Sequence, residues 1–363
     1  SWVTTGWSGD VNHYVTSNPL IYLNASDTGS GVDRIEYILH RWNGTSWILG
    51  SWMNYAGPVS LASIGDTHEC LHRIRIRSFD NGGNAEPAWR QYVMVDNSPP
   101  ASWKEHDGKL VTCPQNQKSL DINTTRSNDV RVFTTEPIGF VIPQVFGNDI
   151  TLTAATQILW NSQIWSGTTT GDLTGNIVIH HHSIIPTGGT STGIGFSQGN
   201  FTYTDGTGTF NGFYVADHSG PYVITHGRVY AMGSGGYTGQ YFEGELNGLV
   251  ESDTFYNASL DFAFIRWITT DTQITLNATD LKTRCSVGSY QIFYRYYLDG
   301  TTPGAFIAGP MNASISFNIT NTGHHILEWY VADDLGTESE HYFQRYYVDD
   351  AAPEITVEVG DPS

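Results

Sequence analysis

The chain has 363 residues, and its 36 acidic residues outnumber 17 basic ones to give a formal net charge of −19. This balance excludes a nucleic-acid surface, which needs clustered Lys and Arg. No apolar run approaches the roughly 18 residues that a membrane helix needs, so no membrane span is expected. The 39 glycines, 14 prolines and 13% aromatic residues indicate many short strands joined by turns. We therefore predict an all-β protein.

Residues 1–101 are predicted to form the first domain. Ile21, Leu23 and Ala25 fall on one face of an alternating run, and residues 72–77 alternate basic with apolar side chains. A period of two places one face of a strand in a core and the other outside. Several such strands separated by turn signals predict a β-sandwich.

Residues 102–262 form the predicted middle domain, which is rich in strands and punctuated by glycine. The segment 206–212 reads Gly-Thr-Gly-Thr-Phe-Asn-Gly and is echoed by Gly-Ser-Gly-Gly-Tyr-Thr-Gly at 233–239. Glycine permits the tight bends of small closed sheets. We expect an antiparallel β-barrel or β-sandwich here.

Residues 263–353 repeat the first domain. The landmarks occur in the same order with nearly the same spacing, and both copies end in proline, which makes a stiff linker. The matched segments are 21–27 with 274–280, 56–58 with 308–310, 72–80 with 325–333, and 92–96 with 346–349.

Residues 354–363 look like the opening of a further repeat. We interpret them as a linker or as a donor strand that adds to a neighbouring domain or subunit. The alternative is a disordered tail.

Three motifs connect the two copies to a known family. In the first copy they read Asp27-Thr-Gly-Ser-Gly-Val32, Asp80-Asn-Gly-Gly-Asn-Ala-Glu86 and Val95-Asp-Asn-Ser-Pro-Pro100. The pattern resembles the tandem Ig-like repeats of bacterial and archaeal cell-surface proteins, of S-layer or surface-filament type. The second copy departs from it at 280–285 and 333–338. The resemblance implies Ig-like β-sandwiches at both ends and a spacer or adhesive role.

N-glycosylation is predicted from the Asn-x-Ser/Thr sequons. Asn24 and Asn277 occupy the same repeat position, and the strand alternation points both outward. Covalent N-glycans suit exposed positions of a secreted chain. The sequons are at Asn24, Asn43, Asn123, Asn200, Asn257, Asn277, Asn312 and Asn318.

Calcium is a candidate ligand because acidic residues gather at turns of the first copy. Carboxylate and carbonyl oxygens are the ligands that Ca²⁺ prefers. The alternative is that these turns simply favour Asp and Asn. The candidate residues are Asp27, Asp33, Asp80, Glu86 and Asp96.

A transition-metal site is a second candidate. His180 and His182 lie two apart in a predicted strand, so they share a face and could bind a metal, with His218 or His226 as a third ligand. The alternative is a polar face with solvated imidazoles.

The three cysteines, Cys70, Cys113 and Cys285, allow one disulfide at most within the chain. Cys113 and Cys285 flank the middle domain and could form it. The alternative is three buried thiols.

No set of residues assembles an active site, so no enzymatic activity is predicted. Asp27-Thr-Gly lacks the second loop that an aspartic protease needs. Glu243 and Glu245 share a strand face at a spacing that a glycosidase could use. The alternative is a pair of solvated surface acids.

We therefore predict an extracellular structural protein on a microbial cell surface, and the sequons and the family resemblance favour an archaeal one. It would be a glycosylated subunit of a surface layer, sheath or filament that associates with itself or with other surface proteins. The alternative is an adhesin or glycan-binding protein whose middle domain carries the specificity.

Overall fold

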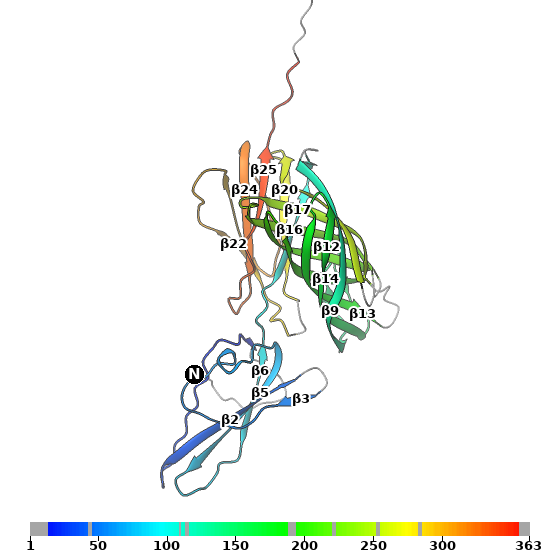
Figure 1. The fold of residues 1–363 in the computed structure, drawn as a ribbon. Coiled ribbons are helices and arrows are strands. Elements are labelled where there is room, and N and C mark those ends of the chain that lie inside the picture. Colours follow the sequence, from blue (N-terminus) through cyan, green and yellow to red (C-terminus); the bar gives the residue numbers. More distant parts are fainter. Residues whose placement is uncertain are drawn as a thin grey trace, which may run out of the picture.

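The computed structural model describes residues 14–42, 46–108, 110–112, 116–187, 194–219, 223–251, 255–281 and 285–355. The regular secondary structure of these residues is almost entirely β-strand, with one short 3-10 helix, η1 (Ala62–Ile64) (Figure 1). The predicted all-β class is therefore confirmed. In this part of the chain no helix has the length and hydrophobicity needed to cross a membrane.

The first repeat unit contains a six-stranded sheet in the order β1-β6-β5-β2-β3, with β4 paired to β2. Its β1 runs parallel to β6, whereas the other pairs are antiparallel. The core is small and consists of Leu39, Leu61, Ile74, Val93 and Val95. The strands are β1 (Tyr14–Val15), β2 (Val32–Trp42), β3 (Trp47–Leu49), β4 (Met53–Asn54), β5 (Cys70–Asp80) and β6 (Trp89–Val95).

The larger sheet of the second repeat unit repeats this strand order from β19 to β22 and has β8 as an additional edge strand. That sheet runs β22-β21-β24-β25-β19-β8, and β19 is parallel to β25 as β1 is to β6. A second sheet runs β23-β20-β7. The strands from the C-terminal part are β19 (Ile265–Ile268), β20 (Gln273–Thr279), β21 (Gln291–Leu298), β22 (Ile307–Met311), β23 (Ile315–Asn318), β24 (Gly323–Ala332) and β25 (Tyr342–Val348).

Two strands that precede the middle domain belong to the second repeat unit. β7 (Ala101–Asp107) pairs with β20, and β8 (Leu110–Thr112) pairs with β19. Ala101 and Trp103 are buried in the core that also contains Ile274 and Leu276. The pairing therefore corrects the boundary predicted at residue 102, because the partner of β7 lies far along the chain and leaves no local signal.

The middle of the chain is an insertion between β8 and β19. Eight antiparallel strands close into a barrel in the order β12-β13-β14-β15-β16-β17-β18-β9. A separate pair, β10 (Val141–Ile142) and β11 (Ile150–Thr151), stands beside it. The barrel strands are β9 (Gln117–Glu136), β12 (Thr156–Gly171), β13 (Gly175–Pro186), β14 (Ile194–Thr204), β15 (Gly208–Ser219), β16 (Val223–Gly235), β17 (Tyr241–Glu251) and β18 (Phe255–Ala263).

Glycine and aromatic residues are matched across the barrel strands. A Cβ atom at Gly212 would lie 2.2 Å from the ring of Phe201, and one at Gly199 would lie 2.6 Å from the ring of Tyr214. Each glycine therefore leaves the space that an aromatic ring on the adjacent strand covers. This explains the recurring glycine–aromatic pattern of the sequence.

The barrel and the second repeat unit share one core. Tyr230 of the barrel packs edge-on against Trp329, with 5.4 Å between ring centroids, and Phe213 lies 5.9 Å from Tyr342. All four side chains are buried in the same apolar cluster. The barrel and second unit thus form one continuous body, and the first unit extends from it at one end (Figure 1).

Candidate functional site

The junction between the two repeat units is formed around Asp96, the residue that follows β6. Its backbone N–H donates to the carbonyl of Val15 at 2.9 Å, which fixes it to the first unit. Its Oδ1 accepts the N–H of Ser98 at 3.1 Å, and its Oδ2 accepts the N–H of Val287 at 2.7 Å. The fully buried carboxylate of the first unit is therefore bonded to a loop of the second.

Two loops of the second unit supply further carboxylates to this junction. Asp280 follows β20, and its Oδ2 accepts the N–H of Gly288 at 2.7 Å. Asp333 follows β24, and its Oδ1 accepts the N–H groups of Leu335 and Thr337, each at 2.8 Å. Each turn thus satisfies one oxygen of its carboxylate and donates no hydrogen bond to the other.

Asp96, Asp280 and Asp333 converge on one point, where one oxygen from each lies within 4.8 Å of the others. Their side chains are 0%, 2% and 7% exposed. Asp280 Oδ1 and Asp333 Oδ2 have no hydrogen-bond partner among the described residues. Within the same residues none of the three carboxylates forms an ion pair with Lys, Arg or His. We call these three residues the junction cluster.

Burial makes this arrangement electrostatically unfavourable when nothing else is bound. Desolvation, with the negative charge of Asp96 beside it, raises the pKa of Asp280 to about 8. Desolvation also raises the pKa of Asp96 to about 6, against the hydrogen bonds from Val287 and Ser98, and the charge of Glu69 adds to the effect. Buried carboxylates in proteins are normally paired or bound to a metal ion, because their isolated charge is costly.

A disulfide lies at the same junction and joins Cys70 to Cys285, 215 residues apart. Cys70 opens β5 and is paired across the sheet with Val95, next to Asp96. The predicted bridge between Cys113 and Cys285 is therefore wrong. The fold places the end of the first unit, and not the edge of the barrel insertion, against the loop of Cys285. Cys113 itself lies outside the described residues.

The predicted calcium residues do not form one site. Asp27 accepts the N–H groups of its own turn, and Asp33 is exposed and pairs with Arg34. Asp80 accepts from Asn84, and Glu86 accepts from Ser78 and Trp89. Only Asp96 of the five belongs to the junction cluster. The repeat alignment held the missing signal, since Asp280 and Asp333 stand where Asp27 and Asp80 stand in the first copy.

His180 and His182 lie on the outer face of β13. They line a cleft of about 200 Å³ between the barrel and the second unit, with Pro99, Pro100 and Tyr342 among its other walls. In the described part of the chain their nitrogens belong to no group of three metal-ligating side chains. The intervening His181 is fully buried beside Tyr214, and burial holds the pKa of His181 well below its usual value.

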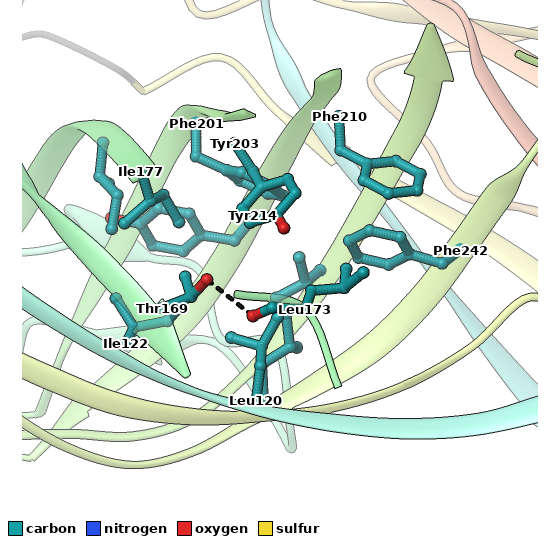
Figure 2. Close-up of a pocket in the computed structure, with 13 residues that line it drawn as sticks. Leu120, Ile122, Thr169, Leu173, Ile177, Phe201, Tyr203, Phe210, Tyr214 and Phe242 are labelled. Atoms are coloured by element: carbon teal, nitrogen blue, oxygen red, sulfur yellow. Dashed lines mark hydrogen bonds between the residues drawn. The ribbon is translucent and has the colours of Figure 1, made fainter. Parts of the chain in front are cut away.

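The barrel interior is filled by its own side chains (Figure 2). The cavity that remains measures about 30 Å³, room for about two water molecules. Its walls are almost entirely apolar, which favours a dry space. They consist of Leu120, Ile122, Thr169, Leu173, Ile177, Ile179, Phe201, Tyr203, Phe210, Tyr214, Val229, Phe242 and Leu260.

Glu243 and Glu245 share the outer face of β17, but their environments differ. Glu243 is 2% exposed and forms a buried ion pair with Lys104 of the second unit, at 3.0 Å. Glu245 is half-exposed and lies near His226 and Arg228. Glu243 is thus neutralised and covered, and it joins the barrel to the second unit.

The sequons differ in their exposure. Asn277 and Asn318 are half-buried and hydrogen-bonded, the first to Ser314 and the second to Thr270. Asn43 lies outside the described residues. Five others are exposed, namely Asn24, Asn123, Asn200, Asn257 and Asn312. These five offer the most accessible positions for the predicted glycans.

Acidification is expected to destabilise the body formed by the barrel and second unit. His106 Nε2 is hydrogen-bonded to the Tyr346 hydroxyl at 2.8 Å, and desolvation lowers the pKa of His106 to about 3. The unfolded chain takes up this proton near pH 6.5, whereas the folded protein does not. The contribution of His106 is therefore complete above about pH 6.5 and falls progressively towards pH 3.

Urea midpoints at about pH 7.5 and about pH 5 measure this effect, which for His106 amounts to at most about 2 kcal/mol. His106→Gln keeps a side chain that can bond to Tyr346 and removes the titration, so the loss between the two pH values should shrink. An unchanged loss in this variant would show that other groups are responsible.

No protein-family model matches this chain, and comparisons with curated proteins and with solved structures give no match. The functional interpretation therefore depends on the geometry of the chain itself.

Proposed function

We propose that this chain is a glycosylated structural subunit of a microbial surface layer, sheath or filament, built from Ig-like repeat units that join end to end. The observation that carries this proposal is the geometry after the second unit. Asp349 N–H donates to Ile268 O at 3.0 Å, and Asp349 Oδ1 accepts the N–H of Ala351 at 2.8 Å. These bonds reproduce those of Asp96 at the first linker.

The neighbouring residue is matched in the same way. Asn97 Oδ1 accepts the N–H of Ser17 at 2.8 Å, and Asp350 Oδ1 accepts the N–H of Thr270 at 3.0 Å. The end of the second unit thus has the hydrogen-bond pattern that leads from the first unit into the second. This supports an array in which each unit presents its end to the next.

The strand that follows each linker supplies the proposed means of assembly. After the first linker, β7 completes the smaller sheet of the second unit by pairing with β20. In the sequence, residues 354–360 follow the second linker as β7 follows the first, and those after residue 355 lie outside the described residues. In the first unit, segment 20–26 corresponds to β20, and its one described ladder contact is the bridge between Ile21 and Val59. We propose that residues 354–360 pair with segment 20–26 of a following repeat unit.

Side-chain exposure supports this pairing. Leu20 is 48% and Tyr22 is 53% exposed in the first unit, and Ile355 is 86% exposed beyond the second linker. Exposed apolar side chains beside an incomplete sheet are typical of strand addition. The disulfide is in keeping with an oxidising, extracellular location.

Removal of residues 354–363 is expected to abolish end-to-end assembly and leave a folded, dispersed chain. Electron microscopy and light scattering of the whole and truncated chains measure this. Ile355→Asp should weaken assembly, whereas Glu354→Gln is a matched control that should not. Unchanged polymers after truncation would overturn the proposed strand addition, and discrete particles of the whole protein isolated from its cells would overturn end-to-end assembly.

A peptide of residues 352–363 separates the two sources of the strand. If the strand comes from another polypeptide, the free peptide should block growth of the polymer. If the receiving unit lies further along the same polypeptide, the peptide should not affect the assembly of a longer polypeptide that contains this receiving unit. The peptide should nevertheless bind the first unit of the 363-residue chain.

Glycan binding is the second candidate function, and the cleft beside His180 and His182 favours it. Polar side chains, including Gln198 and Asn200, line this cleft together with the rings of Phe213 and Tyr342. Such a mixture of aromatic and hydrogen-bonding groups suits a sugar. Saturable binding on a glycan array that is lost in a variant of the exposed cleft residue His180, His180→Ala, would support this function over a purely structural one.

A further inference from the structure

We propose that the junction cluster binds a divalent cation, Ca²⁺, between the two repeat units, with Asp96, Asp280 and Asp333 as its ligands. The site itself follows from the single chain and does not rest on the proposed function. It differs from the site expected from sequence, because two of its three ligands come from the second unit.

The unpaired oxygens are the first argument. Asp280 Oδ1 and Asp333 Oδ2 are buried, and neither has a hydrogen-bond partner in the described residues. The turns satisfy the other oxygens, through Gly288 for Asp280 and through Leu335 and Thr337 for Asp333. An unsatisfied buried carboxylate oxygen is costly, and a cation at the point of convergence would satisfy both of these.

The ligand chemistry and spacing are the second argument. All three ligands are carboxylates, which favour hard cations over zinc or copper. Their oxygens lie within 4.8 Å of one another. Oxygens that bind one Ca²⁺ are at most about 5 Å apart, and Mg²⁺ dehydrates reluctantly and is rarely held by protein ligands alone. The spacing therefore accommodates Ca²⁺, and backbone carbonyls or water would complete its shell of six to eight oxygens.

The location gives the cation a mechanical role. Asp96 is held by the first unit through Val15, and the other two ligands belong to loops of the second unit. The disulfide between Cys70 and Cys285 brings the same two segments together covalently. A bound cation would therefore fix the orientation of one unit relative to the other, because its ligands come from both.

The repeat predicts that the same site recurs at each further junction. Asp80 Oδ1 accepts the N–H of Asn84 at 2.7 Å, as Asp333 Oδ1 accepts that of Thr337 at 2.8 Å. Asp27 stands in the place of Asp280, and Asp349 in that of Asp96. The first unit therefore carries two ligands and the end of the second unit carries the third. This extension rests on the proposed end-to-end assembly.

Calorimetric titration of the EDTA-treated whole chain with CaCl₂ tests the site. We expect one Ca²⁺ per chain, with a Kd between about 10⁻⁶ and 10⁻³ M, and weaker binding of MgCl₂. Asp280→Asn and Asp333→Asn should each weaken calcium binding at least about tenfold. Asp33→Asn is the matched control and should bind normally, because Asp33 pairs with Arg34 on the surface.

Thermal unfolding distinguishes a lost ligand from a damaged fold. Asp280→Asn keeps the size of the side chain and removes a buried carboxyl group that is costly to ionise, so in EDTA the variant should unfold at a temperature at least as high as that of the parent chain. Calcium should then raise the unfolding temperature of the parent and not that of the variant. A variant that merely fails to fold would unfold at a lower temperature in both conditions.

Two results would overturn the site. One is the absence of calcium uptake at about 10 mM, above the weakest affinity usual for extracellular modules, which would indicate that the carboxylates share a proton instead. The other is unchanged calcium binding in both variants. The chain truncated after residue 353 separates this inference from the proposed assembly, because it retains all three ligands and should still bind calcium.

Discussion

Replacement of Lys104 by methionine is expected to destabilise the body formed by the barrel and second unit by about 3–5 kcal/mol. Lys104 lies on β7 and Glu243 on β17, and their side chains are 0% and 3% exposed, with 3.0 Å between Nζ and Oε2. The variant would leave the Glu243 carboxylate buried without its principal counter-charge. Urea unfolding followed by tryptophan fluorescence measures the loss.

The surroundings of Lys104 explain the size of this effect. Burial lowers the pKa of Lys104 to about 8, while Glu243 acts in the opposite direction and keeps the ammonium charged at neutral pH. Burial alone would raise the pKa of Glu243, but the positive charge of Lys104 and its neighbours lowers it to about 2. Rings of Tyr230, Trp329 and Tyr346 lie 5.4, 5.4 and 5.0 Å from Nζ. These rings exclude water from the pair.

A double variant, Lys104→Met with Glu243→Gln, is expected to recover a large part of the lost stability, because no unpaired carboxylate remains. The partly exposed pair of Arg345 and Asp299 provides the matched control, and Arg345→Met should cost at most about 1 kcal/mol. A loss in Lys104→Met no larger than that of the control would contradict the buried pair.

Loss of the disulfide is expected to have the second-largest effect. In Cys70→Ser with Cys285→Ser, the first unit keeps only its small core and its linker, and the disulfide that spans 215 residues no longer constrains the unfolded chain. Removal of a native disulfide typically costs about 2–5 kcal/mol. We expect the first unit to unfold before the rest, as a separate transition in differential scanning calorimetry.

Reduction of the parent protein should reproduce this separate transition, whereas Cys113→Ser should leave the calorimetric profile unchanged. Non-reducing peptide mapping should recover Cys70 and Cys285 in one linked peptide. A linked peptide containing Cys113 and Cys285 would overturn the assignment, and it would also remove the covalent tie from the junction cluster.

The sequence alone determined the secondary structure class and the repetition. Alternating residues such as Ile21, Leu23 and Ala25 predict strands because a strand turns successive side chains to opposite faces. The spacing of matched landmarks predicts two copies of one unit, and both copies have the same order in their larger sheets apart from the additional edge strand β8. These features are local or follow from direct comparison of two segments, so they can be recognised without knowledge of the fold.

The tertiary structure decided everything that depends on contacts between distant segments. β7 pairs with β20 across the whole barrel insertion, and this pairing moved the domain boundary. The same closure brought Cys70 to Cys285 and Asp96 to Asp280 and Asp333. It also buried Glu243 against Lys104. A side chain acquires a disulfide partner, a buried counter-charge or a shared ligand only when folding brings another segment beside it, and sequence spacing does not encode that proximity.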